Sequence, residues 1–178
     1  IGKKPVSVAG MNTGSAQGDR EVADILRRMG ARAEESDGVI TVHPSRLSGI
    51  EIDAKNIPDL VPVLAVTAAA AEGETRIYNA GRLRIKESDR LTACAQLLRD
   101  LGGAADETAD SLTVHGTGLA GGSTHGHNDH RMVMAAAIAA AGCTGEVTIA
   151  GTEAVSKSYP GFFADLQALG SRTASYPN

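Results

Sequence analysis

One short segment of the chain, residues 81–91 with the sequence GRLRIKESDRL, concentrates charged side chains of both signs. Arg90 follows Glu87 by three positions and Lys86 by four, a spacing at which one helical turn presents all three side chains together. Clustered cations bind phosphates and carboxylates through charge-assisted hydrogen bonds. A carboxylate among such cations can hold them in place or can transfer protons. The segment therefore predicts an anion-binding site that also carries groups for acid–base chemistry.

Further polar clusters stand where a strand-like run gives way to a helix-like run. The sequences QGDR, NIPD, NDHR and KSYPG occupy residues 17–20, 56–59, 128–131 and 157–161. Helix N-termini carry partial positive charge and unpaired N–H groups, which attract anions. We expect these termini to gather at one end of the domain. Four cations and three carboxylates would meet there: Lys86, Arg90, Arg131, Lys157, Asp59, Glu87 and Asp129.

The chain repeats itself at an offset of 72 residues, since GARAEESDGVITVH at 30–43 matches GGAADETADSLTVH at 102–115 at six positions. Self-similarity at a fixed period marks a domain built from repeated supersecondary units. Each unit reads as a strand, a loop, an amphipathic helix, two strands and a second helix, which predicts an α/β (α+β) fold. We expect a single domain over residues 1–178, with repeats at about 5–74 and 75–146 and a partial repeat at 147–178.

The second helix of each repeat is apolar on nearly all sides. The sequences are LVPVLAVTAAAA, residues 60–71, and RMVMAAAIAAA, residues 131–141. A helix without a polar face must be enclosed by protein, so we expect both helices to be buried and packed against the sheets. Asn56 and Asn128 are the expected N-cap residues, because an asparagine side chain accepts hydrogen bonds from the first turn of a helix.

The composition narrows the class of protein. The formal net charge is −4, whereas a nucleic-acid-binding domain is normally basic. No apolar run reaches the roughly 18 residues of a membrane span. The two cysteines, Cys94 and Cys143, lie in or beside alanine-rich stretches and are expected to be reduced core residues. We therefore expect a cytoplasmic protein that binds neither nucleic acid nor membrane.

Two other motifs have weaker chemical meaning. HGHNDH places His125, His127 and His130 close together, but glycines around the first two indicate a mobile loop, and no cysteine or further histidine completes a zinc site. GMNTGSAQG, residues 10–18, lacks the Gly-Lys-Ser/Thr ending of a nucleotide-binding loop. We expect no metal ion and no cofactor.

Three polar segments, in this order and at these separations, resemble the C-terminal domain of the 5-enolpyruvylshikimate-3-phosphate synthases. They are LRIKESDRL, HNDHRMVMAAAIA and VSKSYPGFFADLQALG, and IPDLVPVLAVTAAAAEGET extends a resemblance that runs from about Val6 to Gly170. The resemblance implies a two-domain enzyme of repeated βαβαββ units with its active site between the domains. The implied reaction transfers the enolpyruvyl group of phosphoenolpyruvate to the 5-hydroxyl of shikimate 3-phosphate and releases phosphate, without a metal or an organic cofactor.

The resemblance also implies roles for individual residues. Asp59 and Glu87 match the proton-transfer carboxylates of the family, and Asp59 with Lys86 matches its contacts to shikimate 3-phosphate. The cations that would hold phosphoenolpyruvate are Arg90, Arg131 and Lys157, and the same site would be lined by Asp129 and His130.

The sequence departs from the family pattern in two respects. Arg82 stands where the family motif N-x-R-x-K-E has asparagine, so a contact to the phosphate side of shikimate 3-phosphate is either lost or replaced by a charge. The lysine, serine and arginine contacts of the family's N-terminal domain are absent, so the chain looks like a fragment that is expected to be inactive without that domain. Two alternatives stay open: a domain like the related UDP-N-acetylglucosamine enolpyruvyl transferase, and a non-catalytic anion-binding domain.

Overall fold

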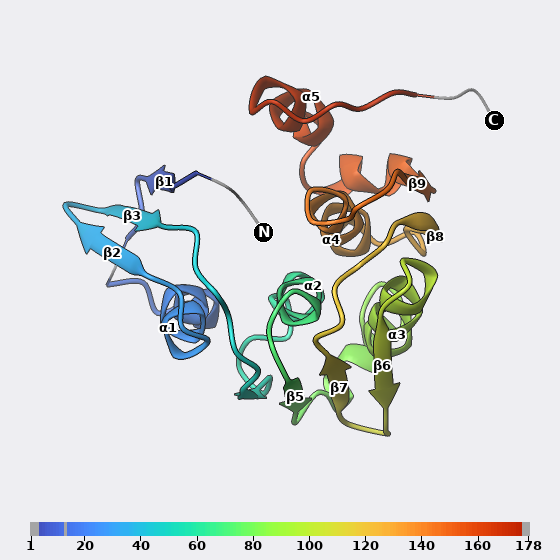
Figure 1. The fold of residues 1–178 in the computed structure, drawn as a ribbon, viewed down its shortest axis with the longest axis horizontal. Coiled ribbons are helices and arrows are strands. Elements are labelled where there is room, and N and C mark those ends of the chain that lie inside the picture. The colour runs from blue at the N-terminus through green and yellow to red at the C-terminus, as the bar shows by residue number, and fades with distance from the viewer. Residues whose placement is uncertain (1–3, 13, 176–178) are drawn as a thin grey trace.

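The computed structural model describes residues 4–12 and 14–175, and Figure 1 shows three small sheets arranged around the helices α2 and α4. The described strands are β1 Val6–Ala9, β2 Ala33–Ser36, β3 Val39–Val42, β4 Glu51–Asp53, β5 Glu74–Tyr78, β6 Ala104–Glu107, β7 Leu112–His115, β8 Gly122–His125 and β9 Val147–Ala150. The described α-helices are α1 Val22–Arg28, α2 Val61–Ala69, α3 Arg90–Asp100, α4 His130–Ala140 and α5 Phe162–Ala168. Short 3₁₀ helices precede α1, α3 and α5, and they are η1 Gly18–Glu21, η2 Gly81–Ile85 and η3 Thr152–Lys157.

The middle of the chain forms a complete βαβαββ unit, β4-α2-β5-α3-β6-β7, with the strand order β4-β5-β7-β6 in its sheet. β4 and β5 are parallel and are connected through α2, whereas β5 and β6 both pair with β7 in the antiparallel direction. Parallel neighbours need a crossover connection, and a helix usually supplies it. The predicted α/β class of repeated βαβαββ units is therefore confirmed.

The other two sheets contain parts of the same unit. β1, α1, β2 and β3 correspond to its last four elements, and β8, α4, β9 and α5 correspond to its first four. The sheets thus group the strands in a different phase from the repeats read in the sequence. Self-similarity fixes the period of a repeat, but it does not fix which strand begins a unit, because every starting point repeats equally well.

Two short strands lie in segments for which the sequence analysis predicted neither a strand nor a helix. β4 has three residues and β8 has four, and β8 falls within the glycine-rich segment 116–128. A Cβ atom on Gly121, which has a φ of 118°, would lie 2.7 Å from the backbone oxygen of Glu146. The glycine therefore permits a close approach between backbones beside the parallel pair β8 and β9, and does not mark a mobile loop.

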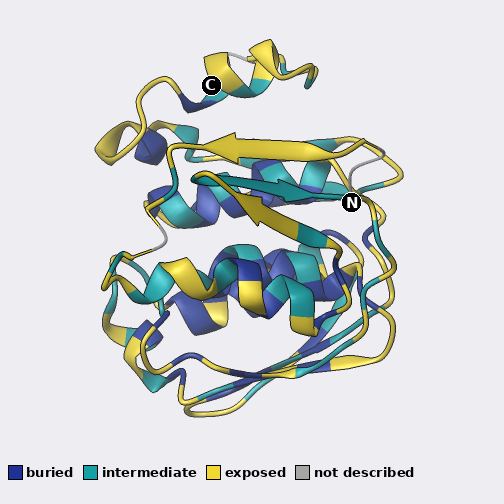
Figure 2. Ribbon diagram, turned by 90° about the vertical axis from the view of Figure 1, so that its left-hand side faces the viewer, coloured by how far each residue is buried: buried dark blue, intermediate teal, exposed yellow. Residues whose placement is uncertain are grey.

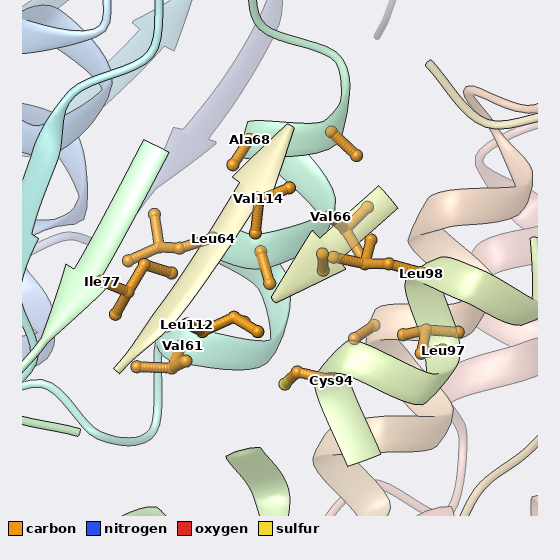
Figure 3. Packing of buried hydrophobic residues seen from close by; sticks show 14 of the residues in the cluster. Val61, Leu64, Val66, Ala68, Ile77, Cys94, Leu97, Leu98, Leu112 and Val114 are labelled. Atoms are coloured by element: carbon orange, nitrogen blue, oxygen red, sulfur yellow. The ribbon is translucent and has the colours of Figure 1, made fainter. Parts of the chain in front are cut away.

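The apolar helices form the centre of the hydrophobic core, as predicted. Val61 and Leu64 of α2 are at most 1% exposed, and Leu98 of α3 and Leu112 of β7 are fully buried against them (Figure 3). Each fully buried side chain of this size contributes about 1.5–3 kcal/mol. Figure 2 shows the same distribution, with buried residues along the inner helices and exposed residues on the outer strands.

The cysteine prediction also agrees with the structure. Both Cys94 and Cys143 are free thiols, Cys94 is buried and Cys143 is half-buried at the edge of the core. Burial raises the pKa of the Cys94 thiol to about 12, so this group is an inert packing residue. Within the described residues, no helix has the length and apolar character needed to cross a membrane.

The buried helices begin differently from the sequence prediction. α4 is capped by Asp129, whose side chain accepts a hydrogen bond of 2.9 Å from the backbone N–H of Arg131. Asn128 precedes this cap in a left-handed conformation with a φ of 54°. No side chain caps α2, so Asn56 is not a cap either. The prediction of two asparagine caps was wrong. At α4 the carboxylate of Asp129 binds the positive end of the helix more strongly than the preceding amide does, and α2 begins only at Val61, five residues after Asn56.

The C-terminal helix α5 is attached to the domain by little apolar contact. Phe162 is its only buried residue, and it joins a small cluster with residues of α4 and η3. In Figure 1, α5 stands apart from the three sheets. β9 pairs with β8 alone among the described strands, and a groove is lined by residues of α4, β9, α5 and the segment 171–174.

Candidate active site

The N-termini of α2, α3 and α4 lie together, as the repeat pattern predicts. Asp59 precedes α2, Arg90 is the first residue of α3, and Asp129 caps α4. The Arg90 side chain binds both carboxylates directly, although Asp59 and Asp129 are 31 and 39 positions away from it in the sequence. The repeat therefore brings three helix ends, each with a partial positive charge, to a single location.

Arg90 is the centre of this cluster. Its Nε donates to Oδ2 of Asp129 at 2.7 Å and its Nη2 donates to Oδ1 of the same carboxylate at 3.3 Å. Its Nη1 donates to Oδ1 of Asp59 at 2.7 Å. The residue is 2% exposed, and Asp129 is fully buried. Removing one partner from a buried ion pair leaves an uncompensated charge, so Arg90 and its two carboxylates form a single unit.

Asp59 is shared among three cations. Besides Arg90, it accepts a hydrogen bond of 3.0 Å from Nη2 of Arg131, and Nζ of Lys86 lies 3.5 Å from its Oδ1. Burial alone would raise the pKa of Asp59, but the charges of Arg131, Arg90 and Lys86 outweigh it and hold this pKa below the usual carboxyl value. In this arrangement the Asp59 side chain is ionised and serves as a clamp for the cations.

The Asp129 carboxylate is also held ionised. Its burial acts to raise the pKa, and the hydrogen bonds and charge of Arg90 outweigh that effect, so the pKa is lowered. Ser88 Oγ donates to the same carboxylate at 3.1 Å. Oxygen and nitrogen atoms of Glu87, Asp129 and His130 lie within 4.8 Å of one another. However, the Asp129 oxygens already accept from Arg90, Ser88 and Arg131, so this cluster is built around a guanidinium.

Glu87 has different surroundings. Its Oε2 lies 3.0 Å from Nδ1 of His130, and its Oε1 lies 3.7 Å from Nη2 of Arg90. The Glu87 side chain is 38% exposed, whereas that of His130 is 11% exposed. A solvent-accessible carboxylate in contact with an imidazole has the geometry to exchange a proton with a bound molecule.

The remaining two predicted site residues are not part of the connected cluster. Lys157, at the end of η3, donates through Nζ to the backbone oxygen of Asn128, next to the α4 cap. Arg82 is exposed and forms no hydrogen bond or ion pair with any residue that the structure describes. The structure therefore brings together Asp59, Lys86, Glu87, Arg90, Asp129, His130 and Arg131, with Lys157 at the margin and Arg82 outside.

Sequence reasoning missed the role of a neighbouring arginine. Arg84 belongs to the same charged segment, but its guanidinium binds Asp89, at the start of α3, and Glu107 of β6. Glu107 is 23 positions away in the sequence, and no local spacing rule connects the two residues. Asp89 was foreseeable as a cap of α3, since it directly precedes the helix and accepts from the backbone N–H of Thr92.

The fold and the joined helix ends define an enolpyruvyl transferase domain. An EPSP synthase from Acinetobacter baumannii superposes with a TM-score of 0.78 at 31% identity, covering 92% of this chain and 41% of that protein. The enolpyruvyl transferase NikO from Streptomyces tendae gives a TM-score of 0.77 at 26% identity, covering 98% of this chain and 41% of that protein.

The sequence comparison is more specific. The family model for EPSP synthase (3-phosphoshikimate 1-carboxyvinyltransferase) matches residues 1–166, and the chain belongs to this family. The 3-phosphoshikimate 1-carboxyvinyltransferase of Clostridium kluyveri is 46% identical over 168 residues, covering 94% of this chain and 39% of the relative. That of Halobacterium salinarum is 48% identical over 172 residues, covering 94% and 40%. The chain therefore spans about two fifths of the length of these relatives.

Proposed function

We propose that this domain supplies half of the active site of an enzyme that transfers the enolpyruvyl group of phosphoenolpyruvate to shikimate 3-phosphate. The observation that carries the proposal is the connected cluster at the joined N-termini of α2, α3 and α4. It gathers the partly exposed cations Lys86 and Arg131 and the buried Arg90 around Asp59, and it places Glu87 beside His130. Membership of the EPSP synthase family supports this substrate pair. The two free thiols support a cytoplasmic location.

In this proposal the cations hold the substrates. Arg90, Arg131 and Lys157 bind the negative groups of phosphoenolpyruvate, and Lys86 with Asp59 contacts shikimate 3-phosphate. Arg82, which has no partner among the described residues, contributes a further positive charge on the side of the shikimate phosphate. Bound phosphates and carboxylates gain most from cations that are already in place, because no reorganisation is then needed.

The reaction requires three proton transfers. The 5-hydroxyl adds to the central carbon of phosphoenolpyruvate as it loses its proton, and the methylene carbon takes up a proton. The methyl group then loses a proton, the bond to phosphate breaks, and the carbon–carbon double bond forms again, which gives the enol ether product. Glu87 is the group placed to exchange protons, because it is accessible and contacts His130.

Asp59 acts as the second carboxylate. Its pKa is low in the free domain because the charges of Arg131, Arg90 and Lys86 outweigh the effect of burial. An anionic substrate competes for Lys86 and Arg131, and it then weakens the charges that keep this pKa low. Substrate binding would thereby make Asp59 a better base than it is in the free domain.

The chain spans about two fifths of its relatives' length, so we propose that an N-terminal domain forms the other wall of the site. Positioning of two substrates is a large part of catalysis. The test is to measure phosphate release from both substrates with the chain alone and with the N-terminal domain added. We expect release only when both domains are present.

The same assay separates the alternatives. Phosphate release with UDP-N-acetylglucosamine in place of shikimate 3-phosphate would indicate the related transferase activity. Binding of phosphoenolpyruvate without any release by the two domains together would indicate a non-catalytic domain. Either result, or turnover by the chain alone, contradicts the proposal.

A further inference from the structure

Arg84 lies two residues before Lys86, but its guanidinium makes its hydrogen bonds outside the Arg90 cluster, with residues of α3, of β6 and of the turn after β6. A guanidinium has five N–H donors in a rigid plane, and the hydrogen bonds of Arg84 number five. The Nε atom donates to the backbone oxygen of Ala109 at 2.9 Å. The two Nη atoms donate to Asp89 Oδ2 at 2.8 Å, Thr92 Oγ1 at 3.1 Å, Glu107 Oε2 at 3.1 Å and the backbone oxygen of Thr108.

These partners form a closed ring between two elements. Asp89 caps α3 by accepting from the backbone N–H of Thr92 at 3.1 Å, and Thr92 Oγ1 donates to Glu107 Oε2 at 2.9 Å. Glu107 is the last residue of β6. Arg84 thus joins the start of α3 to the end of β6 and to the turn that follows it. None of its hydrogen bonds reaches Asp59, Arg90 or Asp129, so its effect on the site is indirect.

Two members of the ring, Arg84 and Asp89, lie on either side of the site residues Lys86 and Glu87 in the sequence. They are five positions apart. Ile85, which stands between Arg84 and Lys86, is 84% exposed. An exposed isoleucine provides no apolar anchor for this stretch of backbone. The conformation of residues 85–88 therefore depends on how its two ends are held.

We propose that Arg84 is a positioning residue that fixes residues 85–88, so that Lys86 faces Asp59 and Glu87 faces His130. The expected effect on kcat rests on the proposed function, whereas the expected effect on the conformation of residues 85–88 does not. A lysine cannot replace Arg84, because an ammonium group has three donors and lacks the planar fork that spans Asp89, Glu107 and two carbonyl groups.

The chain offers a matched control at the other end of α3. Arg99 donates through Nε and Nη2 to the backbone oxygen of Ala105 in β6, at 3.1 and 2.6 Å. It therefore links the same helix to the same strand with the same chemical group, but it is remote from Lys86 and Glu87. A purely structural contribution of Arg84 would be reproduced by substitution of Arg99.

The experiment compares Arg84→Gln, Arg84→Lys and Arg99→Gln. Amide hydrogen exchange at residues 85–88 is measured without substrate, and kcat and KM are measured in the full-length protein. We expect both Arg84 variants to raise the exchange rates at 85–88 by about tenfold or more and to lower kcat by about 10²-fold, the scale of a displacement near 1 Å. Arg99→Gln should lower the melting temperature and change neither quantity.

Unchanged exchange at residues 85–88 in Arg84→Gln overturns the proposal, and so does an equal loss of kcat in the Arg84 and Arg99 variants. If the wild-type protein has no transferase activity, the proposed function fails, and the exchange measurement alone decides the role of Arg84. If Arg84→Gln does not fold, Glu107→Gln decides by the same criteria, because it weakens the ring and leaves four of the five hydrogen bonds in place.

Discussion

Glu87 and Asp59 are both carboxylates at the joined helix ends, but their neighbours differ. Asp59 contacts three cations and its pKa is lowered, since the charges of Arg131, Arg90 and Lys86 outweigh its burial. Glu87 contacts an imidazole and lies 3.7 Å from its nearest arginine nitrogen. Two carboxylates in unlike surroundings are suited to unlike tasks, and this difference supports the proposal that Glu87 is the main proton-transfer group.

Glu87→Gln tests this assignment in the full-length protein. Glutamine keeps the shape and one hydrogen-bond acceptor but cannot exchange the proton. We expect kcat to fall by about 10²–10⁴-fold with modest changes in KM. Steady-state kinetics with both substrates provides the measurement. A rise in both KM values with kcat within a few-fold of wild type would show that Glu87 only holds Lys86 and Arg90 in place, and Asp59 would become the candidate.

A second prediction about a single residue concerns the exposed side chain of Arg82. A charge-assisted hydrogen bond to the substrate phosphate contributes about 1.5–3 kcal/mol. Arg82→Ala should therefore raise KM for shikimate 3-phosphate by roughly tenfold or more and leave KM for phosphoenolpyruvate nearly unchanged. Arg32→Ala, at an exposed arginine that directly precedes β2 and pairs with Glu34, serves as a control for the loss of one surface charge. An unchanged KM in Arg82→Ala would mean that this side chain remains in solvent.

At the scale of elements, one histidine connects the three antiparallel strands of the complete unit. Nε2 of His115 on β7 lies 2.8 Å from Asp106 on β6, and its Nδ1 lies 3.0 Å from Glu74 on β5. Both ring nitrogens face a carboxylate, so the arrangement requires the protonated imidazole. The hydrogen bond to Asp106, together with Glu74, raises the pKa of His115 above its usual value.

This contact predicts a pH-dependent stability of the sheet. Because the pKa is higher in the folded protein, the stabilisation is complete below about pH 6.5 and is lost as the pH rises through the raised folded value. His115 is partly exposed, so the effect is small. We expect His115→Gln to reduce the difference between the melting temperatures at pH 6 and pH 8.5 by about 1–3 °C. Identical pH profiles for the two proteins would contradict the prediction.

At the scale of the whole molecule, the sequence predicted which residues form the site better than it predicted their hydrogen-bond partners. The buried helices followed from the absence of a polar face, and the meeting of Asp59, Arg90 and Arg131 followed from the repeat and from resemblance to a known family. The phase of the repeat was not predicted. β8 has no apolar residue that would mark a strand, whereas β4 carries a short alternation of isoleucine and acidic residues that the sequence analysis missed. The ring around Arg84 depends on a partner in β6, and only the folded chain brings that partner near.

The loose attachment of α5 has a consequence for how the molecule would lose its structure on heating. Phe162 is the only buried residue of α5, and β9 pairs with β8 alone among the described strands. Segments with few buried contacts open at a lower free energy than the global fold. The C-terminal part of the chain is therefore expected to undergo local unfolding while the Arg90 cluster stays intact.

Lys157 belongs to this less stable part, since η3 leads directly into α5 and the Lys157 side chain reaches Asn128 from there. A moderate rise in temperature should weaken the binding of phosphoenolpyruvate while the far-ultraviolet circular dichroism of the domain is nearly unchanged. Trypsin added at that temperature should cleave after Lys157 before it cleaves after Arg90 or Arg99 of α3 or Arg131 of α4. Under the proposed function, affinity for phosphoenolpyruvate and the integrity of the fold would be lost at different temperatures, and the weakest segment of the domain would set the upper temperature of substrate binding.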